Sequence, residues 1–176
     1  MEVDKAPISC AQLFPSREAA ERSASCRLEI TLCRDCAHIW NAAYQPSPIS
    51  LYGEDYYSSV TVSGQAREHQ VSLAQELDRL IGFNGKKVLE IGCGDGFFLQ
   101  SIKSLKADVI GFEPSATFTL SAEFPGVQVF NEHFDFTQPL DLHGDPDMVV
   151  MRHVLEHLPA PRQQLSSCLL YTSPSP

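Results

Sequence analysis

The sequence has no long hydrophobic run, and this absence excludes one class of protein at the outset. None of its apolar stretches approaches the roughly 18 residues that span a bilayer. The opening residues, MEVDKAPISC, include two acidic side chains and lack the apolar core of a secretory signal peptide. We therefore expect a cytoplasmic protein. Internal repeats and low-complexity tracts are also missing from the sequence.

Positive charge is scarce as well, since 13 Lys and Arg residues stand against 22 Asp and Glu residues, for a net charge of −9. The first 50 residues carry a net charge of only −1, so most of the acidity lies in the remainder. A field of this sign repels phosphate backbones, so we expect no nucleic-acid partner. No stretch reads as a basic amphipathic helix, so a membrane partner is not expected either.

What the sequence does contain is a globular composition, with 43% hydrophobic and 20% charged residues over 176 positions. Its periodicity predicts helices over 16–22, 64–82 and 116–124, and a strand over 27–32. On the second helix, one apolar face is predicted from Val71, Ala74, Leu77, Leu80 and Ile81. Short apolar runs predict further strands over 87–91, 108–112, 127–130 and 148–151. This alternation predicts an α/β parallel sheet with right-handed crossovers.

The most informative stretch is VLEIGCGDG at 88–96, where a strand leads into a glycine loop that opens a helix. Glycine permits a sharp turn and lets a ligand approach the backbone without a Cβ in the way. A dinucleotide site would need a third glycine where this sequence has Phe97. Asp95 would also place negative charge beside a pyrophosphate. Both features argue against NAD or FAD, and hence against a nucleotide-dependent oxidoreductase.

Glu113 ends the second strand of the predicted sheet, 21 residues after Gly92. A carboxylate at that place can accept hydrogen bonds from ribose hydroxyls. The sequence therefore predicts a nucleoside ligand that has free ribose hydroxyls and no pyrophosphate.

The glycine loop EIGCGDG and the acid at Glu113 resemble class I S-adenosylmethionine (SAM)-dependent methyltransferases. The resemblance implies a Rossmann-like fold, SAM as the cofactor and a small-molecule methyl acceptor. It also implies a set of cofactor-binding residues at the strand ends and the loops after them: Glu90, Gly92, Cys93, Gly94, Gly96, Glu113, Pro114, Phe134 and Arg152. Cys93 is expected to pack in the loop rather than to react.

The segment RHVLEH at 152–157 follows the fourth strand of the predicted sheet. Ligands of open parallel sheets bind at the carboxyl ends of the strands, and the fourth strand is expected beside the first. His153 and His157 are therefore candidate catalytic bases near the glycine loop. The alternative is that His157 only caps or packs the helix that follows. Glu156 could orient a histidine or face solvent.

Cys33 and Cys36 form a C-x-x-C pair directly after the strand predicted over 27–32. Such a turn can supply two of the four ligands of a structural zinc. Cys10, Cys26 and His38 are the other nearby candidates. A redox pair and plain thiols are the alternatives to zinc.

The chain also resembles methyltransferases with an N-terminal zinc-binding segment, several of which are C-methyltransferases of nucleotide-linked sugars. The matching stretches are CRDCAHIWN, YGEDYYSS, the glycine loop and RHVLEH. This wider resemblance implies that Tyr56 and Tyr57 lie near the substrate, the alternative being ordinary packing. An earlier C-x-x-C that is usual in that family is missing here.

We therefore expect a zinc-binding segment over 1–50, a connector and helix over 51–85, and an incomplete SAM-binding domain over 86–167. Only four strands of the methyltransferase sheet are predicted. The last residues, CLLYTSPSP at 168–176, resemble a translated sequencing adapter and are predicted to be a non-native tail. The competing interpretation is a non-catalytic SAM- or zinc-binding module, or an inactive fragment.

Overall fold

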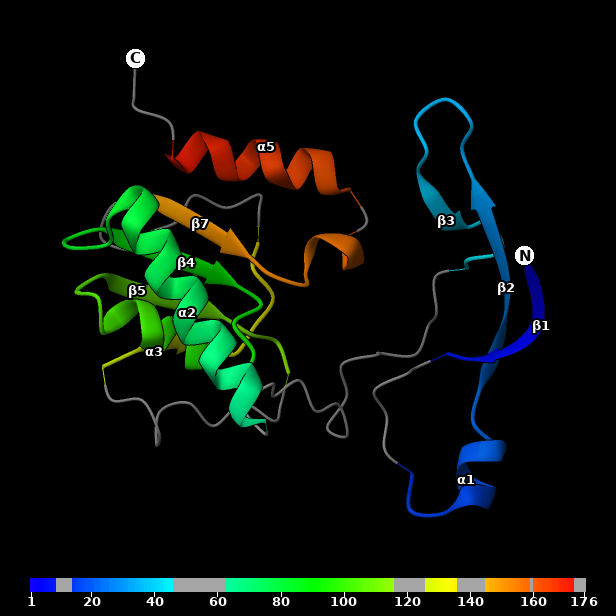
Figure 1. The fold of residues 1–176 in the computed structure, drawn as a ribbon. Coiled ribbons are helices and arrows are strands. Elements are labelled where there is room, and N and C mark those ends of the chain that lie inside the picture. Colours follow the sequence, from blue (N-terminus) through cyan, green and yellow to red (C-terminus); the bar gives the residue numbers. More distant parts are fainter. Residues whose placement is uncertain (9–13, 46–62, 116–125, 136–144, 159, 173–176) are drawn as a thin grey trace. The chain divides into compact units, whose positions relative to one another are not determined.

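The computed structural model describes residues 1–8, 14–45, 63–115, 126–135, 145–158 and 160–172 (Figure 1). The helix predicted over 116–124 lies outside the described residues, as do Cys10, Tyr56 and Tyr57. The chain divides into two compact units, Met1–Tyr57 and Ser58–Pro176. None of the helices in the described parts of the chain is long and apolar enough to cross a membrane.

The first unit holds a three-stranded antiparallel sheet of order β1-β2-β3, made of β1 (Glu2–Pro7), β2 (Ser25–Leu32) and β3 (Ile39–Asn41). The short helix α1 (Arg17–Glu21) begins as predicted, because the Ser16 hydroxyl accepts a hydrogen bond from the Ala19 amide at 3.2 Å. The strand predicted over 27–32 is confirmed as part of β2. β1 and β3 were not predicted, since β1 has little apolar alternation and β3 has only three residues.

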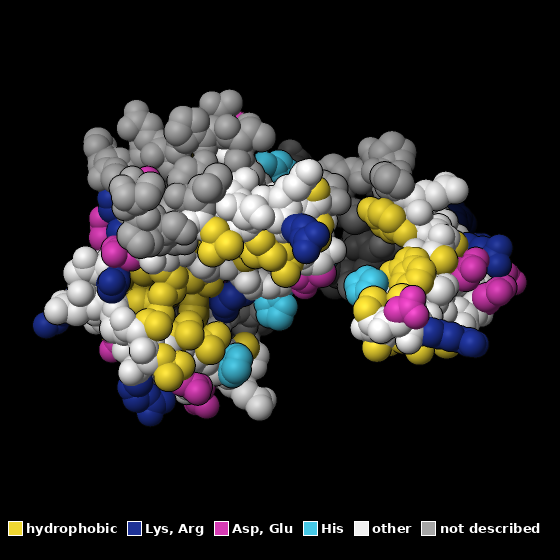
Figure 2. Space-filling view, turned by 90° about the horizontal axis from the view of Figure 1, so that it is seen from above, with side chains coloured by type: hydrophobic (Ala, Val, Ile, Leu, Met, Phe, Trp, Pro, Cys, Tyr) yellow, Lys and Arg dark blue, Asp and Glu magenta, His cyan; other side chains and the backbone are white. Residues whose placement is uncertain are grey.

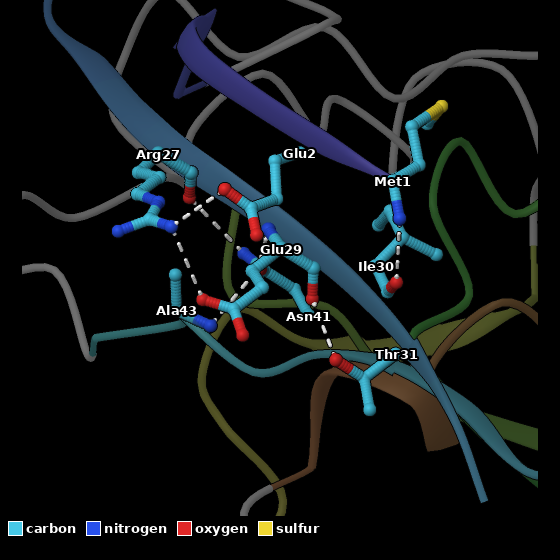
Figure 3. A network of polar contacts seen from close by, with 8 residues as sticks. All are labelled: Met1, Glu2, Arg27, Glu29, Ile30, Thr31, Asn41 and Ala43. Carbon is cyan, nitrogen blue, oxygen red and sulfur yellow. Dashed lines mark hydrogen bonds and ion pairs between the residues drawn. The ribbon is translucent and has the colours of Figure 1, made fainter.

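One side chain joins the backbones of this unit at the end of the β2–β3 hairpin (Figure 3). Asn41 Oδ1 accepts hydrogen bonds from the Glu29 amide at 2.7 Å and the Ala43 amide at 3.1 Å. Its Nδ2 donates to the Arg27 carbonyl at 3.4 Å. The ion pair between Arg27 and Glu2, at 2.9 Å, is exposed and so adds little stability. Asn41 therefore links three backbone groups at this end of the hairpin, in addition to the pairing of β2 with β3.

We expect Asn41→Ala to lower the stability of the first unit by about 1–2 kcal/mol, because two backbone donors lose their acceptor. Hydrogen exchange of the Glu29 and Ala43 amides, followed by NMR, measures this directly. Glu2→Gln is the matched control and should leave both exchange rates nearly unchanged. Equal protection of these amides in Asn41→Ala and in the parent chain would contradict the prediction.

The second unit holds a four-stranded sheet of order β6-β5-β4-β7 in which every neighbouring pair is parallel. Its strands are β4 (Lys87–Ile91), β5 (Asp108–Phe112), β6 (Gln128–Phe130) and β7 (Met148–Met151). Its helices are α2 (Gly64–Ile81), α3 (Phe97–Lys103), the single 3-10 turn η1 (Leu155–His157) and α5 (Pro161–Thr172). The predicted parallel α/β sheet is confirmed, and so is the placement of β7 beside β4.

Helices pack on both faces of this sheet (Figure 1). Val88 and Val109 lie in a buried cluster with Ala74 of α2 and with Phe98, Leu99 and Ile102 of α3. The alternate strand residues Leu89, Ile91, Ile110 and Phe112 cluster instead with Phe134 and with Cys168 of α5. Because successive strand side chains point to opposite faces, the two clusters form the two halves of a layered core.

One expectation about helices needs correction. The apolar face predicted on α2 is only partly buried, since Leu80 is 74% exposed and Val71 and Ile81 are exposed as well. α5 was not predicted. It extends into the residues expected to be a non-native tail and includes the buried Cys168, and the origin of that tail stays a prediction. Hydrophobic side chains remain visible on the surface of this unit (Figure 2), and the exposed ones include Leu165 and Leu169 of α5.

Gly111 in the middle of β5 lets the glycine loop and α3 approach the sheet closely. A Cβ built at this position would lie 2.6 Å from Leu99 Cδ1 and 2.7 Å from Cys93 Sγ. Both distances are far below van der Waals contact, so only glycine fits without a shift of its neighbours. Gly111 therefore sets the distance between β5 and the loop that carries the candidate site.

Candidate functional site

The glycine loop that follows β4 is hydrogen-bonded to the end of β5. The amides of Gly92 and Cys93 donate to the Phe112 carbonyl at 2.8 Å and 3.2 Å. Gly92, Gly94 and Gly96 have φ values of 72°, 56° and 74°, in the left-handed region. Side chains resist this region, so the three glycines are required by the backbone path, as the sequence analysis expected.

Gly92 also meets a side chain from the segment after β7. A Cβ built at Gly92 would overlap Val154 Cγ2. Val154 therefore packs directly on the loop backbone, and it carries the neighbouring His153 to the same end of the sheet. The parallel register of β4 with β7, which pairs Ile91 with Met151, brings the two strand ends together.

The two candidate catalytic histidines occupy different positions in this segment. His153 is exposed and has a φ of 56°, one of three non-glycine residues in the described chain with a positive φ. Such strained residues are enriched at functional sites. His157 is exposed at the end of η1, and its amide donates to the Val154 carbonyl at 2.9 Å. Glu156 is exposed beside it.

The Glu113 carboxylate connects the end of β5 with the glycine loop. Its Oε2 accepts a hydrogen bond from the Gly94 amide at 2.9 Å, and its Oε1 accepts one from the Ser115 amide at 2.9 Å. The residue is only 6% exposed. Each carboxylate oxygen can accept a second hydrogen bond, so Glu113 can hold both the loop and a ligand hydroxyl. Pro114 follows it and is partly buried.

A second acid, Glu90 of β4, lies fully buried beneath the loop and pairs with Arg152. Arg152 Nε and Nη2 lie 2.9 Å and 2.8 Å from Glu90 Oε1, and the guanidinium stacks 3.8 Å from the Phe98 ring centre. Glu90 Oε2 is buried and has no hydrogen-bond partner among the described residues. Burial raises the pKa of Glu90 to about 7, although the charge of Arg152 opposes this shift. Asp95 and Glu113 add smaller repulsive contributions.

We expect the stability contributed by Glu90 to fall as pH rises. The pKa of Glu90 is about 7 in the folded chain and near 4.5 when unperturbed, so the folded state binds more protons between these values. Stability is therefore fully present below pH 4.5 and is lost as pH rises through 7. Glu90→Gln keeps the shape but cannot ionise. Urea unfolding at pH 5 and pH 8 should show the parent chain losing stability relative to Glu90→Gln, and a gain would contradict this assignment.

Cys93 and Phe134 are both buried. Cys93 is 3% exposed, and burial raises the pKa of its thiol, so the thiol stays protonated, as expected of a packing residue. Phe134 meets Phe112 edge to face with ring centres 5.1 Å apart, and Phe112 stacks on Phe130 at 4.9 Å. Phe134 is thus part of the core, and its role toward a cofactor stays a prediction.

The Cys33–Cys36 pair lies in the turn between β2 and β3 of the first unit. The Ala37 amide donates to the Cys33 carbonyl at 3.0 Å, and the Cys33 amide donates to the His38 carbonyl at 2.8 Å. Hydrogen bonds from the backbone of Cys36 and Asp35 lower the pKa of Cys33. Within the described ranges, no group of three or more His, Cys, Asp or Glu residues could hold a metal ion. This turn thus offers two thiols rather than a complete zinc site.

Three residues that shape the site were not predicted as site residues from the sequence: Gly111, Val154 and Asn131. Gly111 and Val154 matter through close packing across different elements, which no local pattern reveals. Asn131 follows β6, and its Nδ2 donates to the carbonyls of Glu113 and Ser115, each at 2.8 Å. A single Asn after a strand gives no signal in the sequence beyond a common turn residue.

Comparisons with solved structures agree with this architecture. The SAM-bound amino pentose methyltransferase CalS10 of Micromonospora echinaspora superimposes with a TM-score of 0.50 at 18% identity, over 69% of this chain and 55% of that one. The plantazolicin methyltransferase BpumL, in complex with SAH and a pentazolic substrate analogue, gives a TM-score of 0.50 at 17% identity, over 63% of this chain and 44% of that one. At such identities these likenesses concern the fold, which is Rossmann-like.

Curated sequences give closer relatives. The ubiquinone biosynthesis O-methyltransferase of Escherichia coli O157:H7 is 32% identical over 113 residues, which cover 61% of this chain and 47% of that protein. The protein of the same name from Aliivibrio fischeri is 33% identical over 116 residues, 60% of this chain and 49% of its own. The chain thus spans about half the length of these relatives. A family model described as a methyltransferase domain matches residues 66–175, and the chain therefore belongs to the methyltransferase domain family.

Proposed function

We propose that the chain binds SAM at the glycine loop and transfers its methyl group to a small-molecule acceptor. The observation that carries this proposal is the buried Glu113 carboxylate, which is bonded to the Gly94 amide at the end of β5. It has acceptor capacity left for ribose hydroxyls, directly beside a loop whose backbone a ligand can approach. Family membership and the methyltransferase relatives support the same assignment.

The charges around the loop suit SAM better than a dinucleotide. Glu90, Asp95 and Glu113 are close enough for Asp95 and Glu113 to raise the pKa of Glu90. Because Arg152 pairs with Glu90, the negative charge at the loop comes mainly from Asp95 and Glu113. These two acids repel a pyrophosphate and attract the sulfonium and ammonium groups of SAM. The buried Glu90 Oε2, without a partner among the described residues, is an acceptor that a ligand ammonium can use. The residues present therefore fit SAM, and they do not fit NAD or FAD.

SAM supplies a methyl group on a sulfonium, which makes it a strong methyl donor. The chain's own part is to orient this donor through Glu113 and the loop, and to take a proton from the acceptor. We assign the role of the base that accepts this proton to His153. This residue follows β7 and adjoins Val154, which packs on Gly92. His157 is the second candidate for this role. Most of the rate enhancement then comes from placing donor and acceptor together.

For the acceptor, a carbon atom of a nucleotide-linked sugar follows from the resemblance of CRDCAHIWN and RHVLEH to sugar C-methyltransferases. Methylation of an oxygen atom is the second candidate, because relatives at 32% and 33% identity are O-methyltransferases of ubiquinone biosynthesis. Tyr56 and Tyr57 are retained as candidate substrate contacts on the same resemblance. Zinc takes no part in the proposed methyl transfer. Metal analysis of the purified chain, compared with a Cys33→Ser/Cys36→Ser variant, tests whether these two cysteines bind zinc.

Calorimetry with SAM, SAH and NADH tests the binding part of this proposal. We expect SAM and SAH to bind and NADH to fail. Transfer of labelled methyl groups from SAM to a panel of nucleotide-linked sugars and phenolic acceptors then tests catalysis. His153→Gln should reduce transfer and leave SAM affinity unchanged. Binding of SAM without transfer to any acceptor would favour the non-catalytic module or an inactive fragment, and tight binding of NADH would overturn the proposal.

A further inference from the structure

We propose that Asn131 is a positioning residue for the ribose of SAM, acting through Glu113. The inference rests on the proposed function and deepens it. In this proposal a residue outside the glycine loop orients the Glu113 carboxylate that holds the ribose. Several hydrogen bonds converge on the segment Glu113–Ser115.

The Asn131 side chain spans this segment from the neighbouring strand. Asn131 follows β6, and its Nδ2 donates to the Glu113 and Ser115 carbonyls, at 2.8 Å each. An amide nitrogen has two hydrogens, so this group is fully used on the two carbonyls. The Glu113 amide donates in turn to the Phe130 carbonyl at 3.0 Å, which ties the end of β5 to the end of β6.

The same segment determines where the Glu113 carboxylate points. The Ser115 amide holds Oε1, and the Gly94 amide holds Oε2, both at 2.9 Å. The position of the Ser115 amide depends on the backbone path from Glu113 to Ser115. Asn131 fixes this path by a hydrogen bond to the carbonyl at each end. A chain of hydrogen bonds thus runs from Asn131 through Ser115 to Glu113 and the glycine loop. Without Asn131, the carboxylate would keep its charge and its bond to the Gly94 amide, but the Ser115 amide that holds Oε1 would lose its fixed position.

The chemistry of the site explains why an amide is needed. Both acceptors are carbonyl oxygens, so the side chain must present two donors in one plane. Asp at this position would set carboxylate oxygens against those carbonyls, and Ala would leave the carbonyls without a donor. Asn131 is exposed, so its replacement by Ala removes little packing. The effect of Asn131→Ala should therefore appear in ligand binding more than in stability.

Binding of two ligands separates positioning of the ribose acid from a general structural role. The ligands are SAH and an SAH analogue that lacks both ribose hydroxyls, measured by calorimetry on the full chain. We expect Asn131→Ala to weaken SAH about tenfold, the equivalent of losing one or two hydrogen bonds, and the analogue by less than about twofold. Asn131→Asp should weaken SAH further. Asn84→Ala, an exposed Asn in the turn before β4, is the matched control and should change neither affinity.

A double variant adds an independent readout. If Asn131 acts through Glu113, Asn131→Ala should cost little further SAH affinity in a Glu113→Gln background, because the effects of coupled residues are not additive. Circular dichroism checks that each variant folds. If Asn131→Ala does not fold, Asn131→Ser is measured in its place, with the same expected results.

The outcomes distinguish this inference from the proposed function. Failure of the parent chain to bind SAH overturns both. Binding by the parent chain with unchanged SAH affinity in Asn131→Ala overturns only the role of Asn131. Equal weakening of SAH and its analogue also overturns that role, since it would indicate a structural effect that does not depend on the ribose.

Discussion

Gly92→Ala should strongly weaken SAM binding and destabilise the second unit, whereas Gly85→Ala should do neither to a comparable degree. The two glycines have nearly the same backbone conformation, with φ values of 72° and 75°. A side chain costs about 1–2 kcal/mol in that conformation at either position. Only at Gly92 would the new Cβ also overlap a neighbour, Val154 Cγ2, while Gly85 has nothing within 4 Å.

The overlap at Gly92 adds the cost of overpacking, about 1–3 kcal/mol, and pushes the loop away from the segment after β7. SAM affinity should fall by a factor of at least about 100, because the proposed SAM-binding loop is displaced. Calorimetry with SAM and urea unfolding measure the two effects. Similar losses in Gly85→Ala and Gly92→Ala would show that backbone strain alone matters. The double variant Gly92→Ala/Val154→Ala should recover part of the stability, because it removes the Val154 Cγ2 methyl group that the new Cβ would overlap.

Glu113→Gln is expected to weaken SAM binding by about 100-fold, or about 2.7 kcal/mol, which is within the range of lost hydrogen bonds to a charged group. The carboxylate accepts from the Gly94 and Ser115 amides on its two oxygens. A Gln side chain has one oxygen and one NH2 group, so its NH2 must face one of those two donors. The glycine loop or the Ser115 amide then loses its acceptor, and the ribose loses a negative partner.

Glu76→Gln on the exposed side of α2 is the matched control for this substitution, and it should leave SAM affinity unchanged. Glu113→Asp should give an intermediate affinity, because it keeps the charge but shortens the side chain. Calorimetry with SAM on the three variants makes the comparison. SAM affinity in Glu113→Gln within twofold of the parent chain would rule out Glu113 as the ribose acid.

Much of the second unit could be predicted because its local patterns are strong. The strands at 87–91, 108–112 and 148–151 have the predicted bounds, since short apolar runs next to glycine and proline leave few alternatives. The parallel topology then placed the end of β7 beside the glycine loop, because consecutive crossovers have one hand. The first unit was harder, since its short strands β1 and β3 form only by pairing with β2.

The sequence by itself determined the fold class, the glycine loop and the acid that ends the second strand of the parallel sheet. These features depend on backbone conformation and on residue spacing within one or two neighbouring elements. Only the tertiary structure decided which residues support them. Gly111 is required because three elements converge on it, Val154 because it packs on Gly92, and Asn131 because it bridges two carbonyls after β5. Such contacts join residues far apart in the chain, so their geometry exists only once the sheet has formed.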